Sequence, residues 1–248
     1  MPTLTSMIIL HITRHGQVLP ASDESWTHAD YPPGDGPLSA LGLRQAVLLG
    51  HRLKGLEFTG PIYASPYRRT METACGVAEI VDTTVHPAPA MREIVKRVEQ
   101  MEHFVGLTAL ELGQLHPRVE TSPDLADMWW TMQAESDAEI EQRVAALVDD
   151  LLRQDKPDSE SHVLLVGHGA STGGVIDHLL RRCAPELIGP PIPGWNCSLS
   201  TFRCRGVDGQ VELVCRQDTD HLPDEAITSN AQTREQVLAS QQGQQAQQ

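Results

Sequence analysis

The feature that most constrains the fold is an almost unbroken apolar run over residues 7–12, which ends in Thr13-Arg14-His15-Gly16. His11 is the one interruption of this run. A strand that is apolar on both faces is typical of the centre of a parallel sheet. Ligands bind beyond the carboxyl ends of such strands. An arginine there can hold an oxyanion with two hydrogen bonds, and a histidine can act as a nucleophile or as an acid and base. The alternative is a strand end with two solvated basic residues.

Two further predicted strand ends carry residues of the same kind. A second apolar run over residues 162–166 ends in Gly167-His168-Gly169, and its glycines would let the backbone and the imidazole approach a ligand closely. Residues 61–65 predict a short strand, and the Ser-Pro pair that ends it predicts a helix N-cap followed by proline. Arg68 and Arg69 would stand in the first turn, where the helix dipole disfavours cations. The arginines therefore indicate that an anion binds at this helix start.

Helix and turn signals connect the predicted strands. Ser39 is a natural N-cap, and Ser136 forms a capping box with Glu139 at the start of another helix. Residues 196–204 and 211–216 predict two strands joined by a turn that contains glycine. Alternating strands and helices favour an α/β fold with a mostly parallel sheet.

Three segments lie outside this alternating pattern. The loop over residues 18–37, which contains proline and glycine, is predicted to bind substrate or to act as a lid. Residues 94–132 predict an insertion over the sheet end, with helical stretches around 108–115 and 125–132. Residues 229–248 are rich in glutamine and poor in large apolar side chains, so they are expected to form a disordered or loosely helical tail.

Length and charge exclude several classes of protein. The 248 residues suffice for one α/β domain with insertions or for two small domains. A net charge of −14 argues against a nucleic acid or an anionic membrane as a partner, and no apolar run approaches the ~20 residues that cross a bilayer. The five cysteines are scattered without a CxxC pair, which predicts neither a disulfide framework nor a zinc site and favours a reducing, cytoplasmic compartment. An anion site in so acidic a chain must draw its positive charge from local residues.

The residues at these positions resemble the signature motifs of the histidine phosphatase superfamily, in its phosphoglycerate-mutase-like branch. The Arg-His-Gly motif is weak by itself, but the motifs occur in the family's order and span roughly residues 7–222. They are Thr13-Arg14-His15-Gly16, Leu38-Ser39 with Gly42 and Gln45-Ala46, Ser65-Pro66-Tyr67-Arg68-Arg69 with Thr73-Ala74, Met91-Arg92-Glu93, Glu135-Ser136 with Arg143, Val166-Gly167-His168-Gly169, and Asp218-Thr219 with His221-Leu222. The resemblance implies a three-layer α/β/α sandwich with a mostly parallel central sheet and helices on both faces. It also implies a catalytic domain over residues 1–228.

The resemblance implies a set of site residues as well. The catalytic residues are His15, Glu93 and His168, and the residues that bind the substrate phosphate are Arg14, Gln17, Arg69, His168 and Gly169. His15 is expected to become phosphohistidine, and Glu93 is expected to donate a proton to the leaving oxygen. The spacing from Ser65 favours Arg69 over Arg68 for the phosphate pocket. Several fixed positive donors suit phosphoryl transfer, which is catalysed mainly by positioning and charge stabilisation. No metal ion and no cofactor is expected.

The sequence departs from the family pattern at two places. Gln17-Val18-Leu19-Pro20 stands where the family often has a Glu-Thr-type pair followed by an asparagine, and residues 94–99 lack the family's Gly-x-Trp-Glu-Gly continuation. Both places concern substrate recognition more than the chemistry at the phosphate. They weaken the assignment of a phosphoglycerate mutase.

The expected function is that of a metal-independent phosphatase that hydrolyses a small-molecule or protein phosphate monoester. Three alternatives stay open: a phosphoglycerate-type mutase, a module that binds phosphorylated ligands without turning them over, and a member of the fold repurposed for chemistry without phosphate. Glu93 argues against the binding module, because binding alone does not need a general acid. The sequence leaves the oligomeric state open.

Overall fold

A computed structural model of the chain describes residues 7–19, 34–97, 104–131, 133–154, 160–189, 194–230 and 232–245. Its centre is a six-stranded sheet with the strand order β3-β2-β4-β1-β5-β6. The strands are β1 (Met7–Arg14), β2 (Ile62–Ala64), β3 (Val85–Pro87), β4 (Glu160–Gly167), β5 (Leu199–Cys204) and β6 (Val211–Asp218). The first four strands are parallel to one another, whereas β5 runs antiparallel to β1 and to β6. The apolar first strand is therefore central, between β4 and β5.

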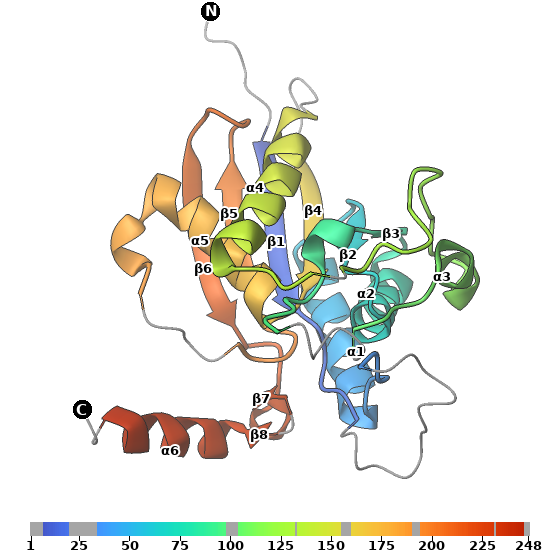
Figure 1. Ribbon diagram of the computed structural model, residues 1–248. Coiled ribbons are helices and arrows are strands. Elements are labelled where there is room, and N and C mark those ends of the chain that lie inside the picture. The colour runs from blue at the N-terminus through green and yellow to red at the C-terminus, as the bar shows by residue number, and fades with distance from the viewer. Residues whose placement is uncertain are drawn as a thin grey trace, which may run out of the picture.

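Helices cover both faces of this sheet and make three layers (Figure 1). The helices α1 (Ala40–Gly55) and α2 (Arg68–Val81) pack together on one face. The helices α4 (Asp137–Arg153) and α5 (Gly169–Cys183) pack together on the other face. The predicted α/β/α sandwich with a mostly parallel central sheet is thus confirmed.

The residues of β1 alternate between the two helical layers. Ile8, Leu10 and Ile12 belong to the buried apolar cluster that includes residues of α4 and α5. Successive side chains of a strand point to opposite faces, so His11 lies on the side of α1 and α2, where its ring contacts Phe58 with 5.8 Å between the ring centroids. Both faces of β1 are buried, which explains its nearly continuous apolar sequence.

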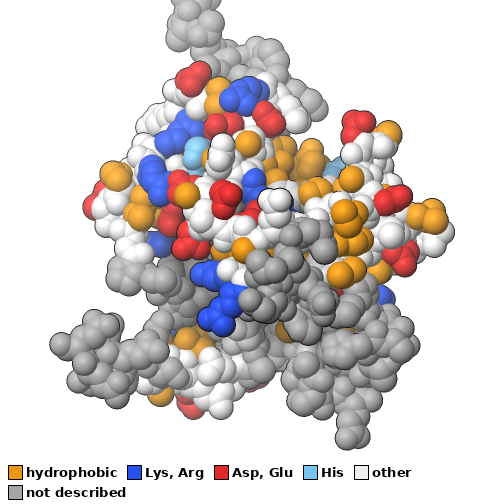
Figure 2. Space-filling model, in the orientation of Figure 1, with side chains coloured by type: hydrophobic (Ala, Val, Ile, Leu, Met, Phe, Trp, Pro, Cys, Tyr) orange, Lys and Arg blue, Asp and Glu red, His pale blue; other side chains and the backbone are white. Residues whose placement is uncertain are grey.

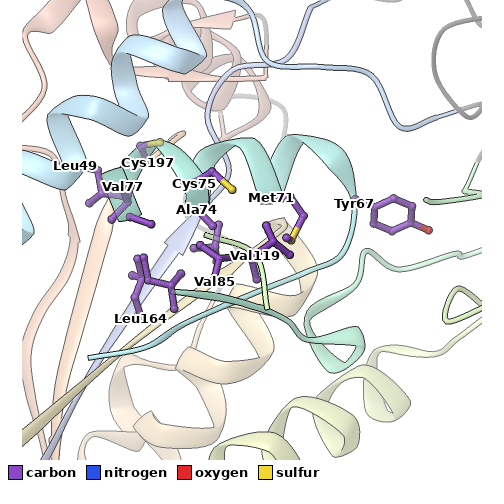
Figure 3. Packing of buried hydrophobic residues seen from close by; sticks show 14 of the residues in the cluster. Leu49, Tyr67, Met71, Ala74, Cys75, Val77, Val85, Val119, Leu164 and Cys197 are labelled. Carbon is purple, nitrogen blue, oxygen red and sulfur yellow. The ribbon is translucent and has the colours of Figure 1, made fainter. Parts of the chain in front are cut away.

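The second apolar cluster lies on the side of α1 and α2 (Figure 3). Leu49 of α1 and Val77 of α2 are fully buried there together with Leu164 of β4. The cluster also reaches the inserted segment, because the ring of Tyr67 packs against that of Trp129 with 4.8 Å between the ring centroids. This second cluster therefore supports both the sheet and the inserted segment.

Two of the predicted helix starts are confirmed and one is wrong. The side chains of Ser39 and Ser136 cap α1 and α4, and Glu139 completes the predicted capping box. By contrast, α2 has Tyr67 as its N-cap residue, two positions after the predicted Ser65. The hydroxyl of Ser65 instead forms a hydrogen bond with a histidine side chain across the sheet end.

The insertion contains one of its two predicted helices. Residues 109–115 form α3 (Ala109–Leu115), which begins with a capping box. Residues 125–131 are irregular, so the helix expected around 125–132 is wrong over the residues that the structure describes. Trp129 accounts for the difference, because its indole nitrogen donates to the Leu107 carbonyl at 2.7 Å and ties this segment to the body. Hydrophobic side chains gather on the surface near α3 (Figure 2).

The C-terminal part of the chain forms a small appendage. β7 (Thr228–Ser229) pairs with β8 (Gln232–Thr233), and α6 (Arg234–Gln245) follows and extends away from the sandwich (Figure 1). The glutamine-rich segment that was expected to be disordered or loosely helical is thus helical over much of its length. The loop predicted over residues 18–37 lies mostly outside the described residues. In the described parts of the chain, no helix is both long enough and apolar enough to cross a membrane.

Candidate active site

The two histidines at strand ends meet because β1 and β4 are parallel neighbours. Arg14 pairs in register with Gly167, and the backbone N–H of His15 donates to the Gly167 carbonyl at 3.0 Å. The residues that follow each strand therefore emerge side by side. The rings of His15 and His168 stand edge to face with 5.2 Å between their centroids.

His15 is buried and held in a defined orientation. Its Nδ1 lies 2.7 Å from the Gly16 carbonyl. A carbonyl can only accept a hydrogen bond, so we assign the ring proton to Nδ1, which leaves Nε2 with a free electron pair. Burial lowers the pKa of His15 well below its ordinary value, and the neighbouring charges of Arg14 and Arg69 lower it further. The imidazole is thus neutral and nucleophilic at neutral pH.

His168 is fully buried, and only one of its ring nitrogens has a partner. Its Nε2 lies 2.8 Å from the hydroxyl of Ser65, whereas its buried Nδ1 has no hydrogen-bond partner among the described residues. The nearest carboxylate oxygen belongs to Glu93, at 3.7 Å from Nδ1. Burial lowers the pKa of His168, as do Arg69 and His15 beside it. A serine hydroxyl can donate or accept; in the tautomer in which it donates to Nε2, the neutral ring carries its proton on Nδ1.

Arg14 is held by acceptors from two later parts of the chain. Its Nη1 donates to the Gly194 carbonyl at 2.6 Å and to the hydroxyl of Ser229 at 3.1 Å. Its Nη2 donates to the side-chain carbonyl of Asn230. The Nε of Arg14 is buried without a partner in the described parts of the chain. The guanidinium is therefore fixed at its tip and retains an unused donor nearer its stem.

Arg69 completes the cationic side of the site. It is 7% exposed, its Nη1 donates to the Gly34 carbonyl at 2.9 Å, and the same nitrogen lies 3.7 Å from a carboxylate oxygen of Asp35. Its guanidinium carbon lies 5.0 Å from the centre of the Tyr67 ring. Arg68 instead pairs with Glu72 at 2.9 Å. Arg69, unlike Arg68, is thus directed toward the histidines, and its charge lowers the pKa of both His15 and His168.

The other predicted site residues lie around this centre. Glu93 is partly exposed beside His168, and its second oxygen accepts the backbone N–H of Ile94 at 2.9 Å. Gly169 is the first residue of α5, and an added Cβ there would meet no atom within 4 Å. Gln17 is different, because its side-chain carbonyl accepts a hydrogen bond from Ser39 at 2.9 Å. That oxygen of Gln17 therefore supports the start of α1.

Several residues that support the site had no signal in the sequence. Asp35 is fully buried next to Arg69, and burial raises the pKa of its carboxyl to about 7. Asn196 donates from its side-chain amide to the His15 carbonyl at 2.9 Å. Ser229 and Asn230, which bind Arg14, stand in the segment that composition marked as a tail. Ser65 does carry a sequence signal, but the signal predicts a helix N-cap, whereas the hydroxyl contacts Nε2 of His168.

The arrangement has the chemistry of an anion site with a nucleophile in it. A buried neutral imidazole is flanked by two arginines, by the unpaired Nδ1 of His168 and by the carboxylate of Glu93. Unpaired buried donors are costly, so such groups indicate a ligand that completes them. In the regions that the structure describes, no three histidine, cysteine or acidic side chains are grouped to hold a metal ion.

The chain is similar to known proteins both in sequence and in structure. A probable phosphoglycerate mutase of Proteus mirabilis is 28% identical over 227 residues, which are 89% of this chain and 98% of that protein. The structure resembles an ecdysone phosphate phosphatase of Bombix mori, solved with tungstate, with a TM-score of 0.62, 18% identity, and coverage of 93% of this chain and 99% of the other. A mycobacterial glucosyl-3-phosphoglycerate phosphatase gives a TM-score of 0.55 at 21% identity, over 86% of this chain and 100% of the other. At these identities the two structures show the fold alone. Residues 10–217 match the family described as the histidine phosphatase superfamily (branch 1), and the chain belongs to that superfamily.

Proposed function

We propose that the protein is a phosphatase that hydrolyses a phosphate monoester through a phosphohistidine on His15 and needs no metal ion for this. The observation that carries the proposal is the pair of unpaired buried groups beside His15. The Nε of Arg14 and the Nδ1 of His168 have no hydrogen-bond partner in the described regions. Both can donate to the oxygens of a bound phosphate, and Arg69 adds a second guanidinium.

The first chemical step forms a bond between His15 and phosphorus. The Nε2 lone pair attacks the phosphorus atom, and the bond between phosphorus and the ester oxygen breaks. The leaving oxygen takes a proton from Glu93, whose carboxyl is partly exposed and lies 3.7 Å from Nδ1 of His168. The positive donors stabilise the charge on the three non-bridging oxygens in the transition state.

The second step returns the enzyme to its starting state. A water molecule attacks the phosphohistidine and gives its proton to the Glu93 carboxylate, while the bond between nitrogen and phosphorus breaks. Inorganic phosphate leaves, and His15 regains its lone pair. The backbone contact from Nδ1 to the Gly16 carbonyl keeps Nε2 available in both steps.

A mutase is the second candidate, because a relative with 28% identity is named a probable phosphoglycerate mutase. A mutase would transfer the phosphate from His15 to another hydroxyl of the same substrate and would exclude water. The two activities share the first step and differ only in the acceptor.

The test is phosphate release from a panel of phosphometabolites and phosphopeptides in the presence of a chelator. We expect inorganic phosphate from at least one ester, together with an acid-labile, base-stable phosphoprotein that is absent in His15→Ala. Interconversion of 2- and 3-phosphoglycerate without phosphate release would establish the mutase instead. A phosphoprotein that persists in His15→Ala would remove the proposed nucleophile.

A further inference from the structure

A cavity lies beside the candidate active site, along the start of α5. Its volume is about 560 Å³, and its lining includes Arg14 and Glu93 of that site. It follows the first turns of α5, between the start of α4 and the end of β6. Cavities of this size commonly hold small molecules. Because Glu93 is the proposed proton donor to the leaving oxygen, the cavity lies where the alcohol part of a substrate would be.

The cavity explains why α5 has a glycine at position 173, although glycine destabilises a helix interior. The helix contains Gly173 and Gly174 in sequence. Gly174 has a packing reason, because an added Cβ would lie 3.1 Å from a methyl group of Val144 in α4. Gly173 has none, because an added Cβ would meet no atom within 4 Å. Gly173 lines the cavity, so its missing side chain keeps space open there.

An independent observation ties the cavity to a ligand. The buried Nε of Arg14 has no hydrogen-bond partner in the described part of the chain, and neither has the buried Nε of Arg216; both arginines line the cavity, and a substrate oxygen could accept from each. A phosphate that binds the Nε of Arg14 would direct its ester oxygen past Glu93. The open space at Gly173 and the unused donor of Arg14 therefore belong to one substrate site.

The lining also restricts the chemistry of the alcohol. The cavity wall carries acidic and basic side chains on both sides, together with Gln217 and Thr172. Among the described lining residues the carboxylates are Glu93, Asp137, Glu141 and Asp177, and the cations are Arg14, Lys96 and Arg216. With Arg14 assigned to the phosphate and Glu93 to proton donation, the other charges are already engaged: Lys96 pairs with Asp137 at 3.7 Å, Glu141 pairs with Arg181, and Nη1 of Arg216 donates to the Leu187 carbonyl at 2.9 Å. These pairings disfavour a second anionic group on the substrate, and the polar wall offers both donors and acceptors to hydroxyl groups.

Resting on the proposed phosphatase activity, we infer that the cavity over Gly173 binds the alcohol part of the substrate, and that this part is uncharged and rich in hydroxyl groups, as in a sugar or polyol phosphate. Gly173 is then a specificity-determining residue, which acts by leaving room for the alcohol. It takes no part in the chemistry at phosphorus.

The experiment compares Gly173→Leu with the wild type on glucose 6-phosphate and on ethyl phosphate. Leucine would fill the space at this position, so kcat/KM for glucose 6-phosphate should fall at least tenfold, while kcat/KM for ethyl phosphate should stay within about twofold. Gly55→Leu is the matched control, because an added Cβ at Gly55 also meets no atom within 4 Å but lies at the end of α1. That variant should leave both esters unchanged.

Four outcomes would overturn the inference. An equal loss on both esters, or no loss on either, would remove the subsite while leaving the phosphatase intact. A wild-type preference for 3-phosphoglycerate over glucose 6-phosphate would contradict the inference that the alcohol part of the substrate is uncharged. Failure of the wild type to release phosphate from any ester would overturn the proposed function and this inference together. If Gly173→Leu does not fold, Gly173→Ala replaces it; the alanine variant should raise the Tm, because alanine favours the helix, and should still lower kcat/KM for glucose 6-phosphate selectively.

Discussion

Two histidine pairs belong to the same two neighbouring strands: His15 and His168 directly follow β1 and β4 at the candidate active site, whereas His11 and His162 lie within these strands. His15 and His168 have ring centroids 5.2 Å apart, and His11 and His162 have ring centroids 5.4 Å apart. In each pair a glutamate oxygen lies 3.7 Å from a nitrogen of the second histidine, and a hydroxyl group contacts one imidazole. The glutamates are Glu93 and Glu160, and the hydroxyl groups belong to Ser65 and Thr201. The two groups thus contain nearly the same residue types.

The two pairs differ in whether their hydrogen bonds are complete. Both ring nitrogens of His11 have partners, with Nδ1 3.0 Å from the hydroxyl of Thr201 and Nε2 3.2 Å from Nδ1 of His162. At the candidate active site, His168 keeps an unpaired buried nitrogen, and arginines stand beside the rings. The pair within the strands has Phe58 as its neighbour instead, with 5.8 Å between its ring centroid and that of each histidine.

The comparison teaches that residue types alone do not identify a site. A histidine pair that satisfies itself within the sheet stabilises the fold, because buried polar groups that are paired cost little. A pair with unused donors at a strand end, surrounded by fixed positive charge, is prepared for a ligand. The following experiments test this distinction, beginning with the largest expected effect.

The first experiment substitutes one histidine of each pair, His15 at the candidate site and His11 within the sheet. His15→Ala should lower kcat on the order of 10⁶-fold, as the loss of a nucleophile does in other hydrolases, for every ester tested. His11→Asn should keep kcat/KM within a few-fold, because the contacts of His11 are with Thr201, His162 and Phe58, away from His15 and His168. Steady-state phosphate release with a check of folding by circular dichroism measures both. Abolished activity in a folded His11→Asn would break the comparison.

The second experiment exchanges the two glutamates. Glu93→Gln should slow an alkyl phosphate by about 10²–10⁴-fold, the usual contribution of general acid catalysis. It should slow p-nitrophenyl phosphate much less, because that leaving group needs little protonation. Glu160→Gln should change neither rate. Equal losses on both esters in Glu93→Gln would remove Glu93 from the acid role.

The third experiment concerns the acceptors that hold Arg14. Asn230→Ala removes the carbonyl that accepts from Nη2, and a hydrogen bond to a charged group is worth about 1.5–3 kcal/mol. We expect the Kd for orthovanadate to rise about tenfold or more, as that energy implies. Gln232→Ala, on the exposed strand β8, is the control and should leave the Kd unchanged. An unchanged Kd in Asn230→Ala would show that Arg14 is held well enough by its other acceptors.

The fourth experiment measures the stability that the pair within the strands contributes. Burial lowers the pKa of His11 to about 3, below its unfolded value of about 6.5. Between these values the unfolded chain binds more protons, so the free energy of unfolding falls as the pH falls from 6.5 toward 3. His11→Leu should reduce this slope by up to about 1.4 kcal/mol per pH unit. It should also lower stability near pH 7 by about 1–3 kcal/mol, because His162 and Thr201 lose a partner. Urea unfolding at several pH values tests both, and an unchanged slope would contradict the assignment.

The smallest effect is expected from the C-terminal helix. Removing the residues after Asn230 should leave kcat/KM and Tm nearly unchanged, because the described side chains of that segment are mostly exposed. Removing the residues after Thr228 should instead lower activity strongly, since Ser229 and Asn230 bind Arg14. A large loss of Tm in the shorter deletion would show that α6 contributes to the fold.

The parts of the molecule that depend on local patterns could be predicted from the sequence. The apolar runs located β1 and β4, and their parallel pairing brought His15 and His168 together. The caps of α1 and α4 followed from serines with a suitable neighbour. Each strand and each cap depends on residues close together in the sequence, and the meeting of His15 with His168 follows because parallel strands end at the same edge of a sheet.

The parts that failed depend on contacts between distant residues. The helix expected around 125–132 is replaced by an irregular segment, because Trp129 is anchored to the Leu107 carbonyl and packs against Tyr67. The acceptors of Arg14 come from residues about two hundred positions later. The sequence around His11 likewise does not indicate that its Nδ1 has a partner, because that partner, Thr201, lies on β5. No local pattern distinguishes such partners from other polar residues.

The position of β1 in the sheet has a consequence for synthesis of the chain. Both neighbours of this strand, β4 and β5, are encoded after residue 159. At about 5–20 residues per second, a ribosome needs roughly 8–30 s to reach β4 after it has completed β1. During that time the most apolar strand has neither of its partners, and the guanidinium at its end has no acceptors. The nascent chain is therefore prone to aggregate, and a product that ends before Ser229 would lack full activity however well its sheet had formed.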